Sequence, residues 1–349
     1  MKILIIVNSL YGGGAERVAS YLANYMTSEY DVHVATFSDN QKTYPLSDKV
    51  VLHDIRPTSK WGIIRFCQRY FHIGRAIMNI SPDVVISFSV SLNYKVLLIN
   101  NFFKRKVIVS ERTSLSRYIS WEADFARKHL YKTASAVVFV SHEDYNNYPF
   151  NNKTVIWNPL HFDIACSKDS VREKAVLAVG NLNRWNVKGF DNLLKAWKQV
   201  SRLHKDWELH FLGKDNDRYI HQLIDGLGIS ASVKFLGQRD DVADIMLQKR
   251  IYVLSSRYEG FPNTLVEAMS QGCACVAFDC QTGPKEIIHD NISGLLVKNQ
   301  DVDELASKLN LLMTDYNLLH KLSEGAKKEV IRFKNRTIMA QWSELIRKM

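Results

Sequence analysis

Short apolar segments alternate with helical segments along the 349 residues of this chain, and this alternation constrains the fold more than any other feature. In the first half we expect strands at residues 2–7, 32–37, 50–55, 83–87, 106–110 and 136–140, and helices at 15–26 and 59–80. Short apolar runs that alternate with helices are typical of a parallel, doubly wound α/β sheet. The first half therefore predicts a Rossmann-like domain.

The pattern breaks near Asn158-Pro159 and begins again after a polar stretch at 166–174, which we interpret as a linker. Further strands are expected at 175–179, 208–212, 233–236, 251–254 and 273–278, with helices at 190–203 and from 302 to the end. We predict two α/β domains of similar size, 1–165 and 166–349, with the last helix able to cross back to the first domain. Open parallel sheets bind ligands at the carboxyl ends of their strands, so two facing sheets would form a cleft.

The formal net charge of +10 suggests a polyanionic partner. Between Asp54 and Asp83 there is no acidic residue, whereas the cations Arg56, Lys60, Arg65, Arg69 and Arg75 all fall there among aromatic and aliphatic residues. A basic, aromatic helix of this kind is typical of contact with an anionic membrane surface. The alternative is an ordinary packed helix with a solvated basic face. Nucleic-acid binding is a further alternative, although no helix-turn-helix, RRM or zinc pattern is present.

The remaining composition favours a cytoplasmic protein. Apolar residues make up 46% and charged residues 23% of the chain, as in globular proteins, and no apolar run is long enough to span a bilayer. The first residues lack a secretory-signal pattern. The five cysteines have no framework spacing, and three of them lie in or beside the apolar run at 273–278, so we expect reduced thiols rather than disulfides or a metal site.

A loop between an expected strand and an expected helix carries two carboxylates, Glu259 and Glu267. The backbone N–H groups at the start of that helix would form an anion site beside hydroxyl-binding carboxylates, which suits a sugar nucleotide. Thr264 and Glu267 also have the spacing of a helix capping box, which would explain Glu267 structurally. Capping does not explain Glu259.

Three other strand ends carry candidate site residues. Gly12-Gly13-Gly14 opens the first helix, where a backbone can approach an anion. It fits a dinucleotide fingerprint poorly because Arg17 replaces the last glycine, but Asp39 could serve as the ribose acid, so an NAD oxidoreductase stays an alternative. The second strand end carries Arg184 and Lys188, cations that could reach a diphosphate. The third carries Gln238 and Arg239, where a base could rest.

These motifs occur together in the order of a known family. The Gly-rich loop, Lys188-Gly189-Phe190-Asp191, Phe235-Leu236-Gly237 and the E-x7-E motif from Glu259 to Glu267 are followed by Gly283-Pro284-Lys285-Glu286 and a segment at 291–297. The chain thereby resembles a family 4 glycosyltransferase of the GT-B fold, the retaining group that builds bacterial surface polysaccharides. The resemblance is specific over 175–312 and weaker in the N-terminal half.

The resemblance implies a role for each matching position. Glu267 would hold the ribose hydroxyls and Glu259 the donor sugar, while Lys188, with Arg184, would neutralise the leaving diphosphate. The diphosphate would also meet Gly13 and Gly14, and the base would lie near Gln238 and Arg239. Backbone groups of Phe261, Pro262, Asn263, Thr264 and Leu265 would bind sugar and phosphate oxygens. The family implies no metal ion and no cofactor, since cations and helix dipoles stabilise the leaving group.

The implied reaction moves a hexose or N-acetylhexosamine from a nucleotide sugar, UDP-linked by expectation, to a lipid-linked glycan at the inner face of the plasma membrane. Two departures stand out. Asn181 replaces the arginine that the family usually has there, and we expect Arg184 to supply the missing charge from a longer loop. Arg112 follows the strand after which many members carry a histidine, and we assign it to the acceptor side. A sugar-nucleotide epimerase on the same scaffold remains an alternative.

Overall fold

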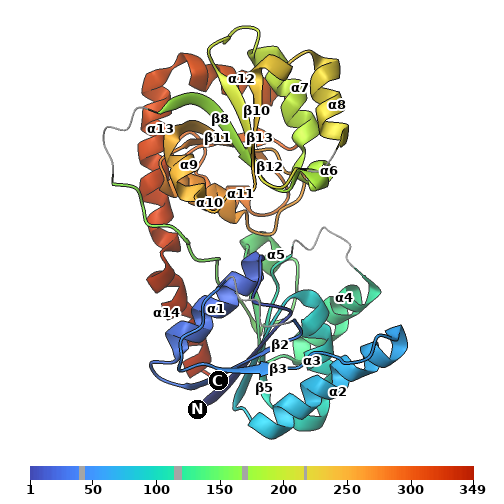
Figure 1. The fold of residues 1–349 in the computed structure, drawn as a ribbon. Helices are drawn as coiled ribbons and strands as arrows, with labels where there is room; N and C mark the ends of the chain where they lie inside the picture. Colours follow the sequence, from blue (N-terminus) through green and yellow to red (C-terminus); the bar gives the residue numbers. More distant parts are fainter. Residues whose placement is uncertain (39–43, 114–119, 167–171, 216–217) are drawn as a thin grey trace. The chain divides into compact units, whose positions relative to one another are not determined.

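The computed structural model describes residues 1–38, 44–113, 120–166, 172–215 and 218–349 (Figure 1). Asp39 and most of the expected linker at 166–174 lie outside the described residues. The chain divides into two compact units. Unit 1 comprises Met1–Pro159 and Asn335–Met349, and unit 2 comprises Leu160–Lys334.

Unit 1 is built on a sheet of seven parallel strands in the order β3-β2-β1-β4-β5-β6-β7. The strands are β1 (Lys2–Val7), β2 (Asp31–Thr36), β3 (Val51–Asp54), β4 (Val84–Phe88), β5 (Lys106–Ser110), β6 (Ala136–Phe139) and β7 (Lys153–Val155). The six expected strands are confirmed to within a few residues, and β7 is an edge strand that the sequence pattern did not reveal. Because β7 has only three half-buried residues, it lacks the apolar run that marks a strand.

Helices cover both faces of this sheet. The helices of unit 1 are α1 (Gly14–Met26), α2 (Gly62–Ile80), α3 (Val90–Phe103), α4 (Trp121–Phe125), α5 (His142–Asn146) and α14 (Asn335–Arg347), with η1 (Ala126–Leu130) and η2 (Tyr131–Thr133). One apolar cluster joins α1 and α14 to one face, and a second joins α2 and α3 to the other. The successive residues Ile3 and Leu4 of β1 belong to the two different clusters, as expected for a strand that is buried on both faces.

Unit 2 is built on a sheet of six parallel strands in the order β10-β9-β8-β11-β12-β13. The strands are β8 (Glu173–Val179), β9 (Glu208–Leu212), β10 (Val233–Gly237), β11 (Lys249–Leu254), β12 (Ala274–Asp279) and β13 (Leu295–Lys298). Two doubly wound parallel sheets confirm the predicted fold class. From β8 the strands are added first toward one edge of the sheet, as β9 and β10, and then toward the other edge, as β11, β12 and β13. The switch point therefore lies between β8 and β11, and open α/β sheets bind ligands at such points.

The helices of unit 2 again lie on both faces of the sheet (Figure 1). They are α6 (Trp185–Lys188), α7 (Phe190–Val200), α8 (Arg218–Leu227), α9 (Val242–Gln248), α10 (Asn263–Ser270), α11 (Pro284–Ile287), α12 (Val302–Thr314) and α13 (Tyr316–Glu329), with η3 (Leu182–Arg184), η4 (Ser230–Ser232) and η5 (Val330–Phe333). One cluster packs α7, α8 and α12 on a single face, around the buried Trp197 and Trp207. Within the described residues, no helix is long and apolar enough to cross a membrane.

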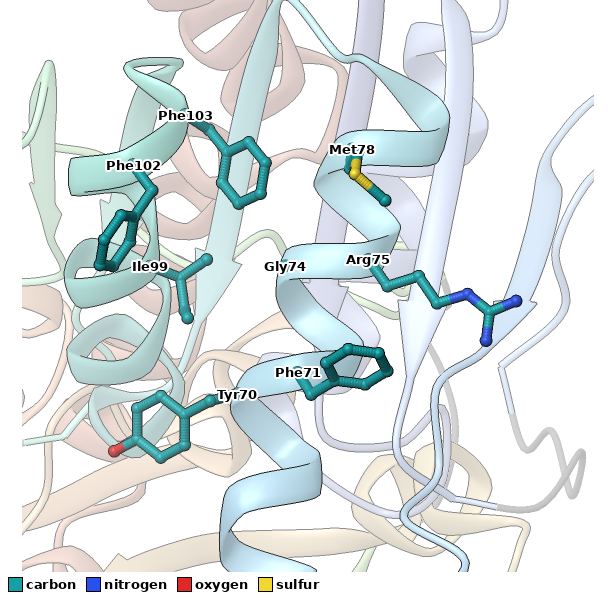
Figure 2. A pocket seen from close by; sticks show the side chains of 8 residues that line it. All are labelled: Tyr70, Phe71, Gly74, Arg75, Met78, Ile99, Phe102 and Phe103. Carbon is teal, nitrogen blue, oxygen red and sulfur yellow. The ribbon is translucent and has the colours of Figure 1, made fainter.

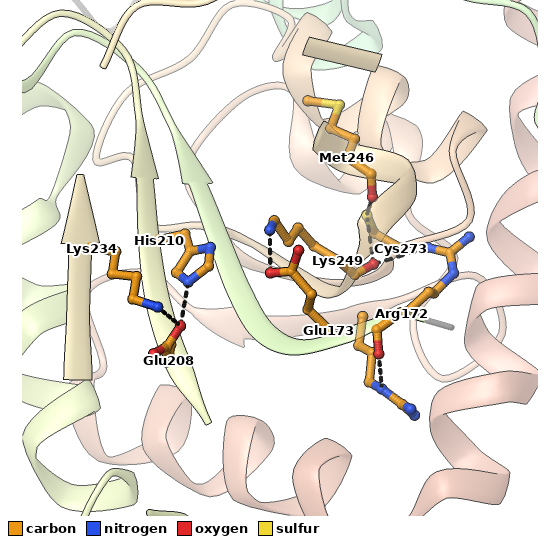
Figure 3. A network of polar contacts seen from close by, with 9 residues as sticks. Arg172, Glu173, Glu208, His210, Lys234, Met246, Lys249 and Cys273 are labelled. Carbon is orange, nitrogen blue, oxygen red and sulfur yellow. Dashed lines mark hydrogen bonds and ion pairs between the residues drawn. The ribbon is translucent and has the colours of Figure 1, made fainter. Parts of the chain in front are cut away.

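A polar network ties together the amino-terminal ends of the unit 2 strands (Figure 3). The Lys249 ammonium, almost fully buried, pairs with the carboxylate of Glu173. Glu208 accepts from Lys234 at 2.8 Å and contacts Nε2 of the buried His210 at 2.9 Å. The network lies at the opposite end of the sheet from the strand ends that carry the candidate site, so we assign it to stability.

Candidate functional site

The carboxyl ends of β8 and β11 lie side by side at the switch point of unit 2, and each leads into a loop with predicted site residues. The loop after β8 carries Lys188, and the loop after β11 carries Glu259. Their side chains meet: Lys188 Nζ lies 2.7 Å from Glu259 Oε1. Both side chains are mostly buried, with exposed fractions of 19% and 14%. The sequence motifs, 71 positions apart, thus converge on one ion pair.

Two further contacts fix Glu259, one at its carboxylate and one at its backbone. Ser256 donates its hydroxyl to Glu259 Oε1 at 2.7 Å, and Thr282 donates its hydroxyl to the Glu259 backbone carbonyl. Oε1 therefore accepts from both an ammonium and a hydroxyl. Glu259 is held in one orientation before any ligand arrives, as a preorganised binding group requires.

A second ion pair joins the two loops beside the first. Arg257 binds Asp191 through two parallel hydrogen bonds of 2.8 Å, a fork geometry that holds both side chains firmly. Arg257 also donates to the Asn186 carbonyl at 2.7 Å and to Gln300 at 2.8 Å. Burial by itself would raise the pKa of Asp191, but the hydrogen bonds and the charge of Arg257, together with backbone hydrogen bonds, outweigh burial and hold that pKa below its usual value.

Gly189 lets the two loops approach each other. Its φ of +62° lies in the left-handed region, and a Cβ built on it would fall 1.9 Å from the backbone oxygen of Ser255. The Ser255 hydroxyl donates to the Lys188 carbonyl at 2.9 Å, and the Arg257 amide donates to the Val187 carbonyl at 2.9 Å. Any side chain at 189 would separate these loops, so the glycine is a packing requirement of the site.

Helix α10 begins directly behind the ion pair, but the expected capping box does not form. The N-cap is Pro262 and no side chain caps the helix. Thr264 lies inside the first turn, where its hydroxyl accepts a hydrogen bond of 2.7 Å from the Tyr252 phenol. The capping interpretation is therefore wrong, because proline ahead of Asn263 starts the helix two residues earlier than the motif implies. The first-turn N–H groups of an uncapped helix are those that an anion can take up.

The other candidate residues in and beside α10 are mostly buried. Glu267 is buried, with 5% of its surface exposed, while Leu265 is fully buried in the core. Phe261 is also buried and packs edge-on against Phe333 at 5.5 Å between ring centroids. For Phe261 and Leu265, only the backbone can therefore serve a ligand.

Arg184, Gln238 and Arg239 are not hydrogen-bonded to the Lys188–Glu259 pair in the described part of the chain. Arg184 is exposed at the end of η3, four positions before Lys188, and makes no ion pair with the described residues. Arg239 binds Asp241 through hydrogen bonds of 2.9 and 2.7 Å. Gln238 follows Gly237, whose φ of +69° turns the chain sharply at the end of β10.

In unit 1, the Gly-rich loop forms the N-terminus of α1, with Gly13 as N-cap and Gly14 as first helical residue. Gly12 has a φ of +76°. The Glu16 carboxylate folds back over Gly13, since a Cβ there would lie 1.8 Å from Glu16 Oε2. Burial raises the pKa of Glu16. This helix terminus thus already holds a carboxylate where an anionic ligand would sit.

Arg112 follows β5 and points inward within unit 1. Its guanidinium donates to Ser110 at 2.6 Å and to Asn158 at 2.5 Å, and lies 5.5 and 5.6 Å from the ring centroids of Phe88 and Trp342. Burial lowers the pKa of Arg112 to about 9, so the side chain stays charged at neutral pH. Its buried Nη2 has no hydrogen-bond partner within the described part of the chain.

Four residues of this arrangement carried no assigned role in the sequence: Asp191, Ser256, Arg257 and Gly213. Arg257 precedes Glu259 by two positions. Its charge beside the motif is the sequence signal by which it could have been identified as a site residue. Gly213 has a φ of +150°, and a Cβ there would lie 2.0 Å from the Gly180 carbonyl oxygen, so the ends of β8 and β9 converge only with glycine. No group of three or more potential metal ligands occurs in the described residues.

Known proteins resemble this chain along nearly its whole length. The family models "Glycosyltransferase Family 4" and "Glycosyl transferases group 1" match residues 12–156 and 166–329. The amylovoran biosynthesis glycosyltransferase AmsD of Erwinia amylovora is 26% identical over 99% of both chains. A Campylobacter jejuni enzyme, GalNAc-alpha-(1->4)-GalNAc-alpha-(1->3)-diNAcBac-PP-undecaprenol alpha-1,4-N-acetyl-D-galactosaminyltransferase, is 29% identical over 99% of this chain and 98% of its own.

Solved structures share the fold. The crystal structure of Anabaena Alr3699/HepE in complex with UDP and glucose superposes with a TM-score of 0.82, 22% identity and full coverage of both chains. The lipopolysaccharide outer core galactosyltransferase WaaB in its apo form superposes with a TM-score of 0.79 and 20% identity, over 100% of this chain and 99% of its own. Two family models that match both halves, relatives aligned over nearly the whole length and this shared fold lead to one conclusion: the chain belongs to the GT-B glycosyltransferases of the family 4 type.

Proposed function

We propose that this glycosyltransferase moves a hexose or N-acetylhexosamine from a UDP-sugar to a lipid-linked glycan, with retention of the anomeric configuration, in cell-surface polysaccharide assembly. The observation that carries the proposal is the Lys188–Glu259 pair at the switch point of unit 2. The relatives support the substrates: the Campylobacter enzyme is named for an undecaprenol diphosphate acceptor, and HepE was crystallised with UDP and glucose.

In this proposal the ion pair is a resting arrangement that the donor rearranges. Without ligand, Glu259 neutralises Lys188, so no buried charge is left unpaired. A bound diphosphate offers Lys188 a second anion, while Glu259 Oε1 and Oε2 accept hydrogen bonds from sugar hydroxyls. Lys188 then faces the charge that grows on the leaving oxygen as the glycosidic bond breaks, which is where a fixed cation accelerates the reaction.

The remaining donor contacts are assigned by position. Glu267 binds the ribose hydroxyls, and the backbone of 261–265 at the start of α10 binds sugar and phosphate oxygens. Gln238 and Arg239 lie near the base. Exposed Arg184 adds a second cation for the diphosphate.

The chemistry needs no protein nucleophile. The acceptor hydroxyl attacks the anomeric carbon from the face that the diphosphate leaves, and its proton passes to a leaving-group oxygen. One carbon–oxygen bond forms and one breaks, and UDP departs with the bonding pair. The protein contributes position and charge stabilisation. We propose that no metal ion or cofactor takes part, since Lys188, Arg184 and the helix terminus supply the positive potential.

The acceptor side is assigned to unit 1, at the cytoplasmic face of the plasma membrane. Buried Arg112 Nη2 has no partner among the described residues and is charged, so it can receive an acceptor hydroxyl or phosphate. The basic, aromatic residues of α2 provide peripheral contact with an anionic surface.

The test is a screen of UDP- and GDP-sugars for binding, followed by mass analysis of products with lipid-linked and free glycan acceptors. The proposal expects one UDP-sugar to bind and one sugar to be added to an acceptor. An epimerised nucleotide sugar formed without acceptor, or reduction of a nicotinamide cofactor, would contradict it.

A further inference from the structure

Helix α2 has two apolar faces, and only one of them packs against the sheet. Ile73, Ile77 and Ile80 are buried in the core. A second set recurs at 63, 67, 71, 74 and 78, a spacing that places these positions on one other face of the helix. On this face Ile63, Phe71 and Met78 are 82%, 66% and 61% exposed. An ordinary surface helix has no such second stripe.

The stripe borders a groove between α2 and α3 (Figure 2). The groove has a volume of about 460 Å³ and is lined by Tyr70, Phe71, Gly74, Arg75, Met78, Ile99, Phe102 and Phe103. In the close-up the rings and aliphatic side chains of the two helices face each other across it, while the guanidinium of Arg75 extends away from it. Phe102 is 83% exposed at its rim. The size and lining are those of a site for an apolar ligand.

Gly74 opens the middle of the groove. A glycine inside a helix destabilises it relative to alanine, so its presence there asks for a reason. A Cβ at 74 would meet Phe103 at 3.6 Å and Ile99 at 3.7 Å, which are ordinary contact distances. A methyl group would therefore fit without strain beside the side chains that line the groove. The glycine keeps the groove empty rather than relieving a clash.

The charges around the groove select its occupant. Residues 55–110 contain a single acidic residue, Asp83, and nine cations. Two of these cations already have an acidic partner, since Arg56 pairs with Asp54 at 2.6 Å and the buried Lys95 pairs with Glu122 at 3.5 Å. The other seven are Lys60, Arg65, Arg69, Arg75, Lys104, Arg105 and Lys106. A second copy of this face would bring cations against cations and is disfavoured. An anionic layer with hydrocarbon beneath it complements both the charges and the stripe.

The position of the groove distinguishes two sources of hydrocarbon. Helices of a parallel α/β sheet run opposite to the strands, so the C-terminal halves of α2 and α3 lie toward the amino ends of the strands. Ligands bind at the opposite, carboxyl edge. Gly74, Met78 and Phe102 belong to those C-terminal halves. The groove is thus far from where the acceptor's reacting hydroxyl would lie within unit 1, which favours a lipid of the surrounding membrane.

We propose that the α2–α3 groove seats one hydrocarbon chain of an anionic membrane lipid. The chain lies over Gly74 between Phe71 and Phe103, the exposed stripe enters the interfacial layer, and Arg75 meets the headgroup. The inference rests on the proposed function for its biological reason, a membrane-bound acceptor, but the groove and its charges stand without it.

The test measures binding of monomeric dodecyl phosphate to the full chain by titration calorimetry. Wild type is expected to bind one molecule, and Gly74→Leu to weaken binding by about tenfold or more because leucine fills the groove. Gly226→Leu is the matched control: Gly226 is an exposed helical glycine of unit 2 with nothing within 4 Å of its Cβ position. It should leave binding unchanged. Unsaturable binding by wild type, or equal affinity in Gly74→Leu, overturns the proposal.

Further readouts keep the test decisive. Gly74→Leu must match wild type in its circular dichroism spectrum and in thermal unfolding, which shows that the variant is folded. If wild type binds dodecyl phosphate but no nucleotide sugar, the proposed function fails and the groove stands. Wild type should sediment with vesicles only when they contain phosphatidylglycerol. The triple variant Arg65→Gln, Arg69→Gln, Arg75→Gln should stay in the supernatant with either kind of vesicle. A dimer that Phe102→Ser dissociates, or a preference for a prenyl diphosphate over dodecyl phosphate, would assign the groove to another occupant.

Discussion

Lys188 and Glu259 show how two short motifs become one site at the scale of single residues. Each is mostly buried, and each would leave an uncompensated charge if the other were removed. Ser256 adds a hydroxyl to the same carboxylate oxygen. In the proposed function, this pair is stable in the free protein and binds a ligand that carries both phosphate and hydroxyl groups.

Removing the cation is expected to slow transfer strongly. Lys188→Ala and Glu267→Ala should each lower kcat/KM by about 10²–10³, because a fixed charge or hydroxyl acceptor at the donor is lost. Lys195→Ala, at an exposed position of α7, is the control and should retain full activity. Steady-state kinetics with circular dichroism of each variant provides the measurement. Turnover within about twofold of wild type in both variants would contradict the assignment.

Gly189 makes a prediction about the backbone. Gly189→Ala should lower the free energy of unfolding by about 1–3 kcal/mol and reduce donor binding, because a Cβ would overlap the Ser255 carbonyl at a φ of +62°. Gly226→Ala, in the exposed C-terminal part of α8, should instead raise it by up to about 1 kcal/mol. Urea unfolding of both variants tests this. Equal stabilities would show that the close approach of the two loops is not required.

At the scale of the element, most of the architecture was predictable, because parallel strands that are buried on both faces have continuous apolar sequences. The strands of β1, β4 and β12 were found within a residue or two. The short edge strand β7 was missed, since its residues are only half buried and carry no pattern. The expected start of α10 was also wrong. Thr264 has capping chemistry, but Pro262 is the N-cap, and Thr264 lies inside the helix, where it accepts a hydrogen bond from the Tyr252 phenol.

The site could be predicted only where its chemistry is local. Glu259 and Lys188 each stand in a recognisable loop, whereas their pairing depends on the adjacency of β8 and β11, which no local pattern specifies. Arg257 and Asp191 were missed for the same reason, because an ion pair between residues 66 positions apart leaves no trace in either segment. Gly213 is one glycine among 16, and only the converging backbone shows its role.

The polar network at the amino ends of the unit 2 strands predicts a dependence of stability on pH. Burial lowers the pKa of His210, and its contact with Glu208 only partly opposes this. The folded state then binds the proton less readily than the unfolded chain, whose histidine pKa is about 6.5. The stabilisation is thus present above that pH and is lost as pH falls below it. Thermal unfolding should show a lower Tm at acidic than at neutral pH.

The comparison variant for that effect is His210→Gln. It removes the titrating group from the buried position, so its Tm should fall less than that of wild type on acidification, with a difference on the order of 1–3 °C. His221→Gln changes an exposed histidine, 48% accessible, and should follow wild type. If acidification lowers the Tm of His210→Gln and of wild type equally, the protonation of His210 does not cause the pH dependence of stability.

At the scale of the whole molecule, charge is distributed unevenly. Of the formal net charge of +10, residues 55–110 account for nine cations and one acid, a net of +8. Unit 1 therefore concentrates the attraction to polyanions, while unit 2 holds the Lys188–Glu259 and Arg257–Asp191 pairs in internally balanced form. In the proposed reaction, unit 1 provides the surface that contacts an anionic layer, and unit 2 provides the donor site.

Metal removal tests the source of leaving-group stabilisation. If Lys188, Arg184 and the start of α10 supply the positive potential, exhaustive treatment with EDTA should leave transfer within about twofold of the untreated enzyme. Metal analysis of the treated sample is the control. A loss of activity that added Mg²⁺ or Mn²⁺ restores would mean that a metal ion performs the role assigned to the two cations.

The central claim is that the Lys188–Glu259 pair is the donor site, and one measurement tests it most directly. Titration calorimetry of wild type and Lys188→Ala with UDP should give saturable one-to-one binding for wild type and a dissociation constant at least about tenfold higher for the variant. Wild-type affinity for UDP in Lys188→Ala, or the absence of any UDP binding to wild type while another nucleotide binds, would contradict the account.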